Sequence, residues 1–391
     1  MKRIYLDHSA TTPVDLEVAT LMMTYYTEKY GNPSSVHSFG REARQALEEA
    51  RRQVAELIGA TPQEITFTSG GTEADNLAII GTAEAMSKKG KHLITSSVEH
   101  HAVLETCEFL AKNGFELTIL PVDAEGIVSV EDVRKAIRPD TILISVMHAN
   151  NEVGAIQPIV EIGQLAKEHG ITFHVDAVQT LGKIPINVKA MNIDLLTVSS
   201  HKIYGPKGVG ALYVRKGVRL APRAHGGSQE KKRRSGTENT PGIIGFGKAC
   251  ELIGKRMDKE DARQIILRDK LMNGIIERIK YVKVNGPLGE KRLANNVNVS
   301  IRFVEGESLL LSLDMLGIAA SSGSACTSGS LDPSHVLLAM GLVHEIAHGS
   351  LRFSLGSQNT EEEIDYVLEQ LPKIVERLRM MSPLYDQAIH K

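Results

Sequence analysis

A regular alternation of short apolar segments with helix-like segments, running from residue 92 to residue 175, constrains the fold more than any other feature. Strands that alternate with helices form a mostly parallel sheet with helices on both faces, and ligands bind at the carboxyl ends of its strands. The sequence therefore predicts an α/β fold with a site at that edge. The predicted strands of this part are residues 92–96, 116–121, 142–146 and 171–175, and helices are predicted after His101, Ser129 and Pro158, with Gly114 and Gly170 as helix stops.

The stretch around Lys202 places a lysine between two further apolar runs, residues 195–198 and 209–214. The break at Gly205-Pro206 predicts a strand, a loop and a strand. A lysine on a loop between buried strands can be desolvated, which lowers its pKa and makes its amine available for a Schiff base. Ser199 and His201 are donors that a phosphate would use. A solvated loop lysine stays open as the alternative, because the chain has 45 Lys and Arg.

Two segments upstream suggest what Lys202 could hold. The strand at 171–175 ends at Asp176, with Gln179 three residues later. A carboxylate there can pair with a protonated pyridine nitrogen, as pyridoxal phosphate requires. The segment 69–72, Ser-Gly-Gly-Thr, lies between a predicted strand and a helix that starts at Glu73, which is a natural phosphate site for the backbone at Gly71 and the Thr72 hydroxyl. It is not a P-loop, because no Gly-Lys-Ser/Thr follows.

The pattern changes after about residue 262, where a smaller α+β domain is predicted. Its elements are a helix at 262–279, strands at 281–284, 297–303 and 351–353, a helix at 307–316, and a last helix opened by a capping box of Thr360 and Glu363. The N-terminal arm, residues 1–15, joins this domain. The division is therefore a large domain at 16–261, and a small domain made of 1–15 and 262–391.

Three segments, 176–179, 199–202 and 321–329, resemble the cysteine desulfurases of the NifS/IscS type, in the class V aminotransferase family. The likeness runs from Tyr5 to the last helix. It implies a fold-type I enzyme with pyridoxal phosphate as cofactor, in which a mostly parallel sheet of the seven-stranded type lies between helices. The small α+β domain would carry the catalytic cysteine loop, and the N-terminal arm would lie near the active site.

The resemblance also implies roles for individual residues. Lys202 would hold the cofactor, Asp176 would keep its ring nitrogen protonated, and Gln179 would bind its phenolic oxygen. The phosphate would be held by the backbone at Gly71 and by Thr72, Ser199, His201 and, from the partner subunit of a homodimer, Thr237. Asn151 would bind cofactor and substrate, and Arg352 the substrate carboxylate, although a structural ion pair is an alternative role for Arg352.

His100 is predicted to stack on the cofactor ring and move protons. Nothing intrinsic to the residues separates it from His101. His100 is preferred because it directly follows Glu99, as the ring-stacking histidine does in the family's Glu-His motif.

Cys326 decides the reaction, because removing sulfur from L-cysteine requires a nucleophile for that sulfur. A cysteine on a Gly/Ser loop suits this role, and the products would be L-alanine and a persulfide. Relatives with such a loop pass sulfur to a scaffold protein for iron–sulfur clusters, and Cys326 would then be a transient cluster ligand. A selenocysteine lyase, another class V enzyme and a non-enzymatic assembly platform are the alternatives. The acceptor stays open between cluster assembly, nitrogenase maturation and tRNA thiolation.

The composition points to a globular cytoplasmic protein. The net charge of −2 gives no reason to expect nucleic acid or an anionic membrane as partner, and no apolar run approaches the roughly 20 residues of a membrane span. The N-terminus lacks the apolar region of a signal peptide. Cys107 and Cys250 are predicted core residues, and the basic run 231–234 is predicted to be a solvated loop.

Overall fold

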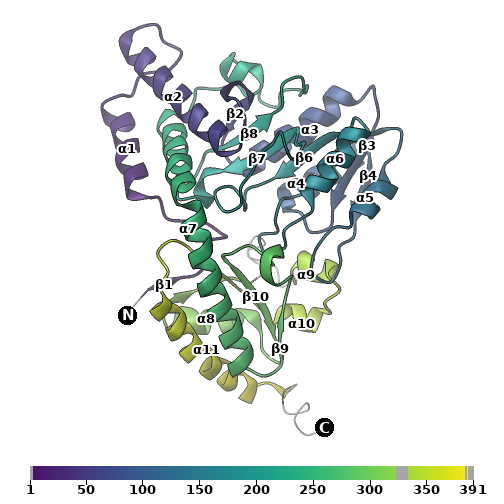
Figure 1. Cartoon of the computed structure of the whole chain (residues 1–391), viewed down its shortest axis with the longest axis vertical. Coiled ribbons are helices and arrows are strands. Elements are labelled where there is room, and N and C mark those ends of the chain that lie inside the picture. Colours follow the sequence, from purple (N-terminus) through teal and green to yellow (C-terminus); the bar gives the residue numbers. More distant parts are fainter. Residues whose placement is uncertain (1–2, 323–332, 384, 386–391) are drawn as a thin grey trace.

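The computed structural model describes residues 3–322, 333–383 and 385. Its largest sheet has seven strands in the order β2-β8-β7-β6-β5-β3-β4 (Figure 1). Neighbouring strands pair in parallel except at β8, which is antiparallel to both of its neighbours. The predicted seven-stranded, mostly parallel sheet is therefore confirmed. The strands are β2 (Ile65–Thr68), β3 (His92–Ser96), β4 (Glu116–Leu120), β5 (Thr141–Ser145), β6 (Thr172–Asp176), β7 (Leu195–Ser199) and β8 (Gly210–Val214).

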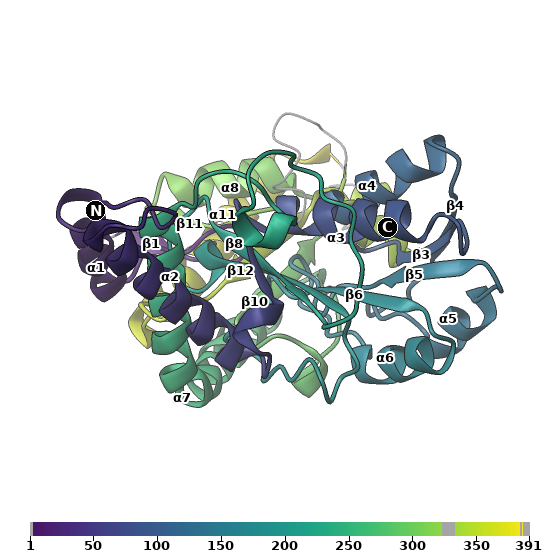
Figure 2. The same ribbon diagram turned by 90° about the horizontal axis from the view of Figure 1, so that it is seen from above.

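Helices cover both faces of this sheet, with α3 and α4 on one side and α5 and α6 on the other (Figure 2). Ser129 caps α5 by accepting a hydrogen bond from the Asp132 N–H, and Gly114 and Gly170 end their helices with φ of 86° and 62°, as predicted. Cys107 and Cys250 are buried, so both are core residues. The helices around the sheet are α1 (Leu16–Thr27), α2 (Ser38–Leu57), α3 (Gly71–Met86), α4 (His101–Lys112), α5 (Val130–Ala136) and α6 (Ile159–Glu168), with 3-10 turns η1 (Pro62–Glu64), η2 (Ser200–Lys202) and η3 (Gln229–Lys232).

A second apolar core packs against a three-stranded antiparallel sheet of order β12-β10-β9. The same part of the chain contains the parallel strand pair β1-β11. Its residues come from both ends of the chain, from Ile4 to Val375. The capping box of Thr360 and Glu363 opens α11 as predicted. The elements of this part are β1 (Ile4–Tyr5), β9 (Val282–Val284), η4 (Gly289–Lys291), β10 (Asn296–Ile301), α8 (Gly306–Asp314), β11 (Ile318–Ala319), α9 (His335–Ala339), α10 (His344–His348), β12 (Ser350–Ser354) and α11 (Glu361–Met380).

The helix expected to begin at residue 262 is instead part of α7 (Thr240–Arg278), which runs through both cores (Figure 1). Phe246 lies in the core beside the large sheet, and Leu271 lies in the second core. Between them the helix exposes charged side chains such as Asp258 and Lys259. The change of pattern near residue 262 therefore lies within one helix, where exposed charged residues separate its two apolar parts. The division of the chain at 261/262 itself stays a prediction.

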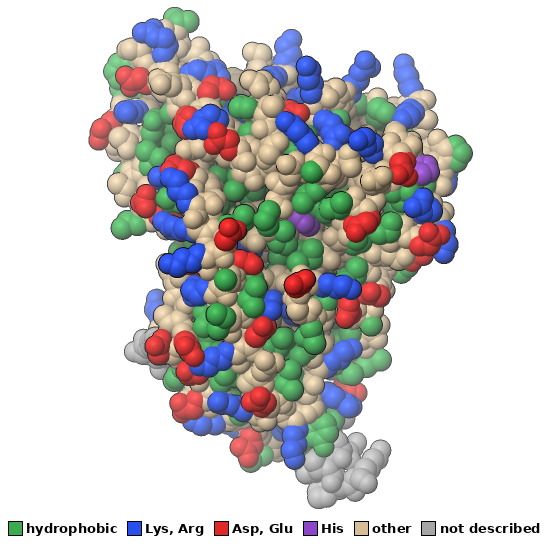
Figure 3. Space-filling model, in the orientation of Figure 1, with side chains coloured by type: hydrophobic (Ala, Val, Ile, Leu, Met, Phe, Trp, Pro, Cys, Tyr) green, Lys and Arg blue, Asp and Glu red, His purple; other side chains and the backbone are tan. Residues whose placement is uncertain are grey.

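The prediction of a solvated loop is wrong for half of the basic run 231–234. Lys231 and Lys232 are exposed, but Arg233 and Arg234 are half-buried. The Arg234 Nε atom lies 2.8 Å from the Glu73 Oε1 atom, because the run folds back over the start of α3. Over much of the face shown in Figure 3, acidic and basic side chains are interspersed. Within the described residues, no helix combines the length and apolarity that a membrane span requires.

Candidate active site

Most of the predicted site residues converge on one cavity of about 250 Å³. It lies where β5, β6 and β7 end, as expected for a mostly parallel sheet. The predicted residues that line it are Gly71, Thr72, His100, Asn151, Asp176, Gln179, Ser199, His201, Lys202 and Arg352. Segments far apart in the sequence therefore meet at the sheet edge that the alternation pattern indicated.

One wall of the cavity is built to hold an anion. Helix α3 begins at Gly71, and no side chain caps it. The first N–H groups of a helix have no partner within the helix and carry partial positive charge, so they attract a phosphate. Close packing fixes this turn, since a Cβ at Gly210 of β8 would lie 2.8 Å from the carbonyl carbon of Gly70. Ser199 and His201 line the same cavity and add further donors.

The N-terminal arm meets the reactive lysine directly. The Lys202 Nζ atom donates to the Ser9 carbonyl at 2.5 Å and to the Ala10 carbonyl at 2.7 Å. The Thr12 N–H donates to the His201 carbonyl at 2.9 Å, which ties the arm to η2. Residue types gave no reason to select Ser9 or Ala10, because both act through backbone oxygens. Only the family resemblance had indicated that the arm lies near the site.

Asp176 ends β6 inside the cavity and is buried. Its Oδ1 atom accepts a hydrogen bond from the Val178 N–H at 2.9 Å. Burial raises the pKa of Asp176, while the Val178 N–H and the charge of Lys202 oppose that rise. Asp75 of α3 also lines the cavity, and burial and the Asp176 charge raise its pKa. Sequence reasoning missed Asp75 because a helical aspartate usually faces solvent.

The structure separates the two adjacent histidines. His100 lines the cavity and caps α4, its Nδ1 atom accepting the Ala102 N–H at 3.1 Å. Burial, then the Lys202 charge, lowers the pKa of His100 to about 4, so the ring is neutral with its hydrogen on Nε2. His101 is not among the cavity-lining residues and packs against His335, with ring centroids 4.7 Å apart.

Arg352 lies on β12 and reaches the cavity from the second core. Its guanidinium pairs with the Asp7 carboxylate at 2.8 Å and donates to the Asn151 carbonyl at 3.0 Å. Its buried Nε atom has no hydrogen-bond partner in the described part of the chain. The ion-pair alternative therefore describes a real contact, and the Asp7 partner was not predicted. The same arginine faces the cavity, where it could bind a carboxylate.

Two predicted site residues, Thr237 and Cys326, stay predictions. Thr237 is exposed and does not line this cavity, so its predicted contact with a partner subunit stays a prediction. Cys326, including its expected role as a transient cluster ligand, lies outside the described residues. Among the residues that are described, no group of three or more His, Cys, Asp or Glu is arranged to hold a metal ion.

The cavity residues fit pyridoxal phosphate. Lys202 supplies an amine, Asp176 a buried carboxylate, His100 a neutral imidazole, and the start of α3 a cradle for an anion. These are the groups that a phosphorylated pyridine aldehyde requires for binding and activation. The fold and this donor set define the class of protein as a fold-type I enzyme.

Comparison with known proteins identifies the family. The family model for aminotransferase class-V matches residues 4–367, so the chain belongs to that family. It is 58% identical over 384 residues to the cysteine desulfurase IscS of Dictyoglomus turgidum, covering 98% of this chain and 97% of the relative. It is 57% identical over 383 residues to the cysteine desulfurase IscS of Methanosarcina thermophila, covering 98% and 94%.

Solved structures give the same result. A NifS-like protein superposes with a TM-score of 0.91 at 41% identity, covering 96% of this chain and 100% of the other. A structure described as SspA in complex with cysteine superposes with a TM-score of 0.81, also at 41% identity, covering 90% and 99%. The predicted resemblance is confirmed over nearly the whole length.

Proposed function

We propose that this protein is a cysteine desulfurase that uses pyridoxal phosphate to remove sulfur from L-cysteine. The observation that carries this proposal is the convergence of Lys202, Asp176 and the anion cradle of α3 on one cavity. Relatives that are more than half identical over nearly the full length carry the name cysteine desulfurase. When bound, the cofactor supplies an acceptor for the electrons released at the Cα atom of the amino acid.

The residues that line the cavity would bind the cofactor and move protons. Gly71, Thr72, Ser199 and His201 would hold the phosphate, Asp176 the ring nitrogen, and Gln179 the phenolic oxygen. Lys202 would attach to the cofactor and, once released by the amino acid, move a proton at the substrate Cα atom. His100 would cover the ring and move protons; because its Nδ1 atom accepts the Ala102 N–H, the proton would pass through Nε2, which carries the hydrogen of the neutral ring.

Arg352 and Asn151 would position the amino acid. The guanidinium presents two parallel N–H groups to a carboxylate, which fixes its orientation as well as its distance. In the structure the Nη1 atom donates to the Asn151 carbonyl and the Nη2 atom donates to the Asp7 carboxylate. We infer that these contacts hold the side chain ready for the substrate carboxylate.

Cys326 would receive the sulfur. Its thiolate attacks the substrate sulfur, the Cβ–S bond breaks, and the electron pair of that bond passes to the substrate carbon. One L-cysteine and one enzyme thiol thus give one L-alanine and one enzyme persulfide, with the two hydrogens of the two thiols shared between the products. The persulfide is a reversible modification from which a thiol of an acceptor can take the outer sulfur.

Two partners follow from this proposal. A second copy of the chain would bring Thr237 to the phosphate, making the protein a homodimer. A sulfur-acceptor protein, such as a scaffold for iron–sulfur clusters, would take the persulfide sulfur. The acceptor protein is not needed for the first turnover, because the sulfur would stay on Cys326 until it is transferred.

The test is a product analysis of the purified protein, loaded with pyridoxal phosphate and given L-cysteine and a thiol reductant. We expect alanine and sulfide in equal amounts. Pyruvate and ammonia with sulfide would instead indicate β-elimination, and an amino group transferred to a keto acid would indicate an aminotransferase. Turnover of selenocysteine but not of cysteine would favour a selenocysteine lyase.

The Arg352→Lys variant tests substrate recognition. A lysine keeps the charge but loses the two-pronged geometry, so we expect KM for L-cysteine to rise about 10- to 100-fold, with a smaller change in kcat. Steady-state kinetics of alanine release measure both constants. Arg268→Lys is the matched control, because Arg268 is also buried and paired with a carboxylate, that of Asp269, but does not line the cavity. An unchanged KM in Arg352→Lys would contradict the assignment.

A further inference from the structure

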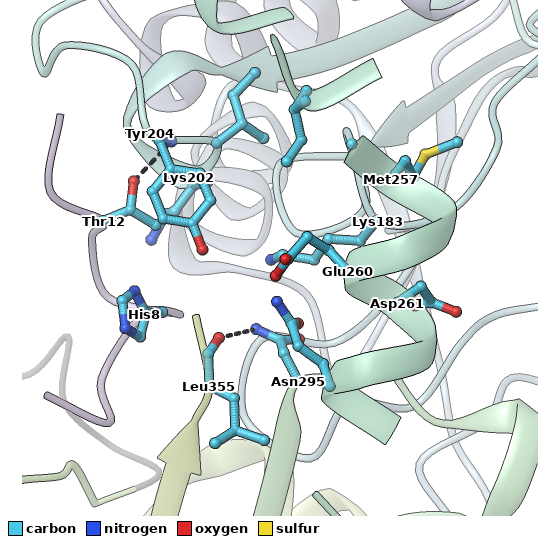
Figure 4. Close-up of a pocket in the computed structure, with 14 residues that line it drawn as sticks. His8, Thr12, Lys183, Lys202, Tyr204, Met257, Glu260, Asp261, Asn295 and Leu355 are labelled. Carbon is cyan, nitrogen blue, oxygen red and sulfur yellow. Dashed lines mark hydrogen bonds between the residues drawn. The ribbon is translucent and has the colours of Figure 1, made fainter. Parts of the chain in front are cut away.

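A second, smaller cavity also has Lys202 in its lining (Figure 4). Its volume of about 30 Å³ is large enough to hold a water molecule. Lys202 lines both cavities, whereas Lys183 lines only the smaller one. Figure 4 shows the Lys183 side chain extending into this cavity beside Glu260 of α7. Lys183 has no role among the predicted site residues.

The hydrogen bonds of Lys183 lead directly into the cofactor cavity. Its Nζ atom donates to the Gln179 carbonyl at 3.0 Å and to the Gln179 Oε1 atom at 3.4 Å. The Gln179 Nε2 atom then donates to the Ser9 carbonyl at 3.0 Å, and the same carbonyl accepts from Lys202. The Oε1 end of the Gln179 amide thus contacts Lys183, and the Nε2 end contacts the Ser9 carbonyl, which Lys202 also contacts.

The surroundings of Lys183 favour a role as a hydrogen-bond donor over a role as a partner in an ion pair. The nearby carboxylate of Glu260 pairs with Arg263 at 2.9 Å. Burial, then the charge of Lys202, lowers the pKa of Lys183 to about 7. Both the ammonium and the neutral amine have N–H groups to donate, so the contact with Gln179 does not depend on the protonation state. Removing a charged lysine from water costs free energy, and the hydrogen bonds to Gln179 give its N–H groups partners in this cavity.

We propose that Lys183 is a positioning residue that fixes the amide of Gln179, so that Nε2 faces the cofactor's phenolic oxygen. This inference rests on the proposed function, because it requires pyridoxal phosphate in the larger cavity. Without Lys183 the amide loses the contact at Oε1 and keeps only the Ser9 contact at Nε2, so the turned amide, whose Oε1 atom would face an oxygen that it repels, becomes more populated.

A double-mutant cycle with Gln179 tests this proposal. Lys183→Met, Gln179→Leu and the double variant are prepared free of cofactor, and the dissociation constant for pyridoxal phosphate is measured by titration of the visible absorption band. We expect Lys183→Met to weaken binding about tenfold and to shift the band in the same direction as Gln179→Leu. The double variant should bind no more weakly than Gln179→Leu alone, because Lys183 acts only through Gln179.

The control is Met257→Leu, which changes a side chain of the same small cavity without touching Gln179 and should bind like the wild type. Losses that add in the double variant, or wild-type binding by Lys183→Met, would overturn the proposal. If Lys183→Met does not fold, Lys183→Gln replaces it under the same criterion, because its side chain ends one bond short of Nζ. A wild type that binds no pyridoxal phosphate would instead refute the proposed function.

Discussion

Replacing Lys202 by alanine is expected to reduce alanine formation from L-cysteine by about four orders of magnitude or more. The substitution would remove both the proposed covalent anchor of the cofactor and the group proposed to move the proton at the substrate Cα atom, and a positioned acid or base alone contributes about 10² to 10⁴ in rate. The residues proposed to hold the phosphate remain, so pyridoxal phosphate should still bind, but without a covalent link. Borohydride reduction followed by intact mass measurement detects that link.

The matched control is Lys207→Ala, because Lys207 lies five residues away on the same connection between β7 and β8 and is exposed. It should form the link and retain activity. A reducible link in Lys202→Ala would assign the anchor to another lysine, and Lys183 would be the first to examine because it also adjoins Lys202.

Replacing Cys326 by serine is expected to leave the cofactor spectrum unchanged and to lower alanine formation at least about a hundredfold. A hydroxyl has far less anionic character near neutral pH than a thiol, and it does not form a persulfide. After exposure to L-cysteine without reductant, the wild type should gain one sulfur atom in its intact mass, and Cys326→Ser should not.

The other two cysteines provide the controls. Cys107 and Cys250 are buried, and burial raises the pKa of both thiols, so neither can readily act as a nucleophile. Cys107→Ala and Cys250→Ala should therefore keep their activity and gain the sulfur atom. Sulfide release by Cys326→Ser at the wild-type rate, with pyruvate in place of alanine, would contradict a persulfide mechanism.

The sequence predicted those features that depend on local pattern. Short apolar strands alternating with helices gave the parallel sheet, and the caps at Ser129 and Thr360 formed as expected. Asp176, Lys202 and the glycine turn before α3 stood out because their side chains or backbone conformation suit the proposed chemistry. The start of α7 was misplaced, because exposed charged side chains such as Asp258 and Lys259 interrupt the apolar pattern of one long helix.

The sequence by itself thus determined the sheet and the reactive groups that lie at the ends of its strands. Only the tertiary structure decided which neighbours those groups have. It brings the carbonyls of Ser9 and Ala10 to Lys202, sets Asp7 against Arg352, and turns His100 into the cavity and His101 away from it. Such contacts join segments hundreds of residues apart, often through backbone atoms that every residue type has, so no local pattern records them.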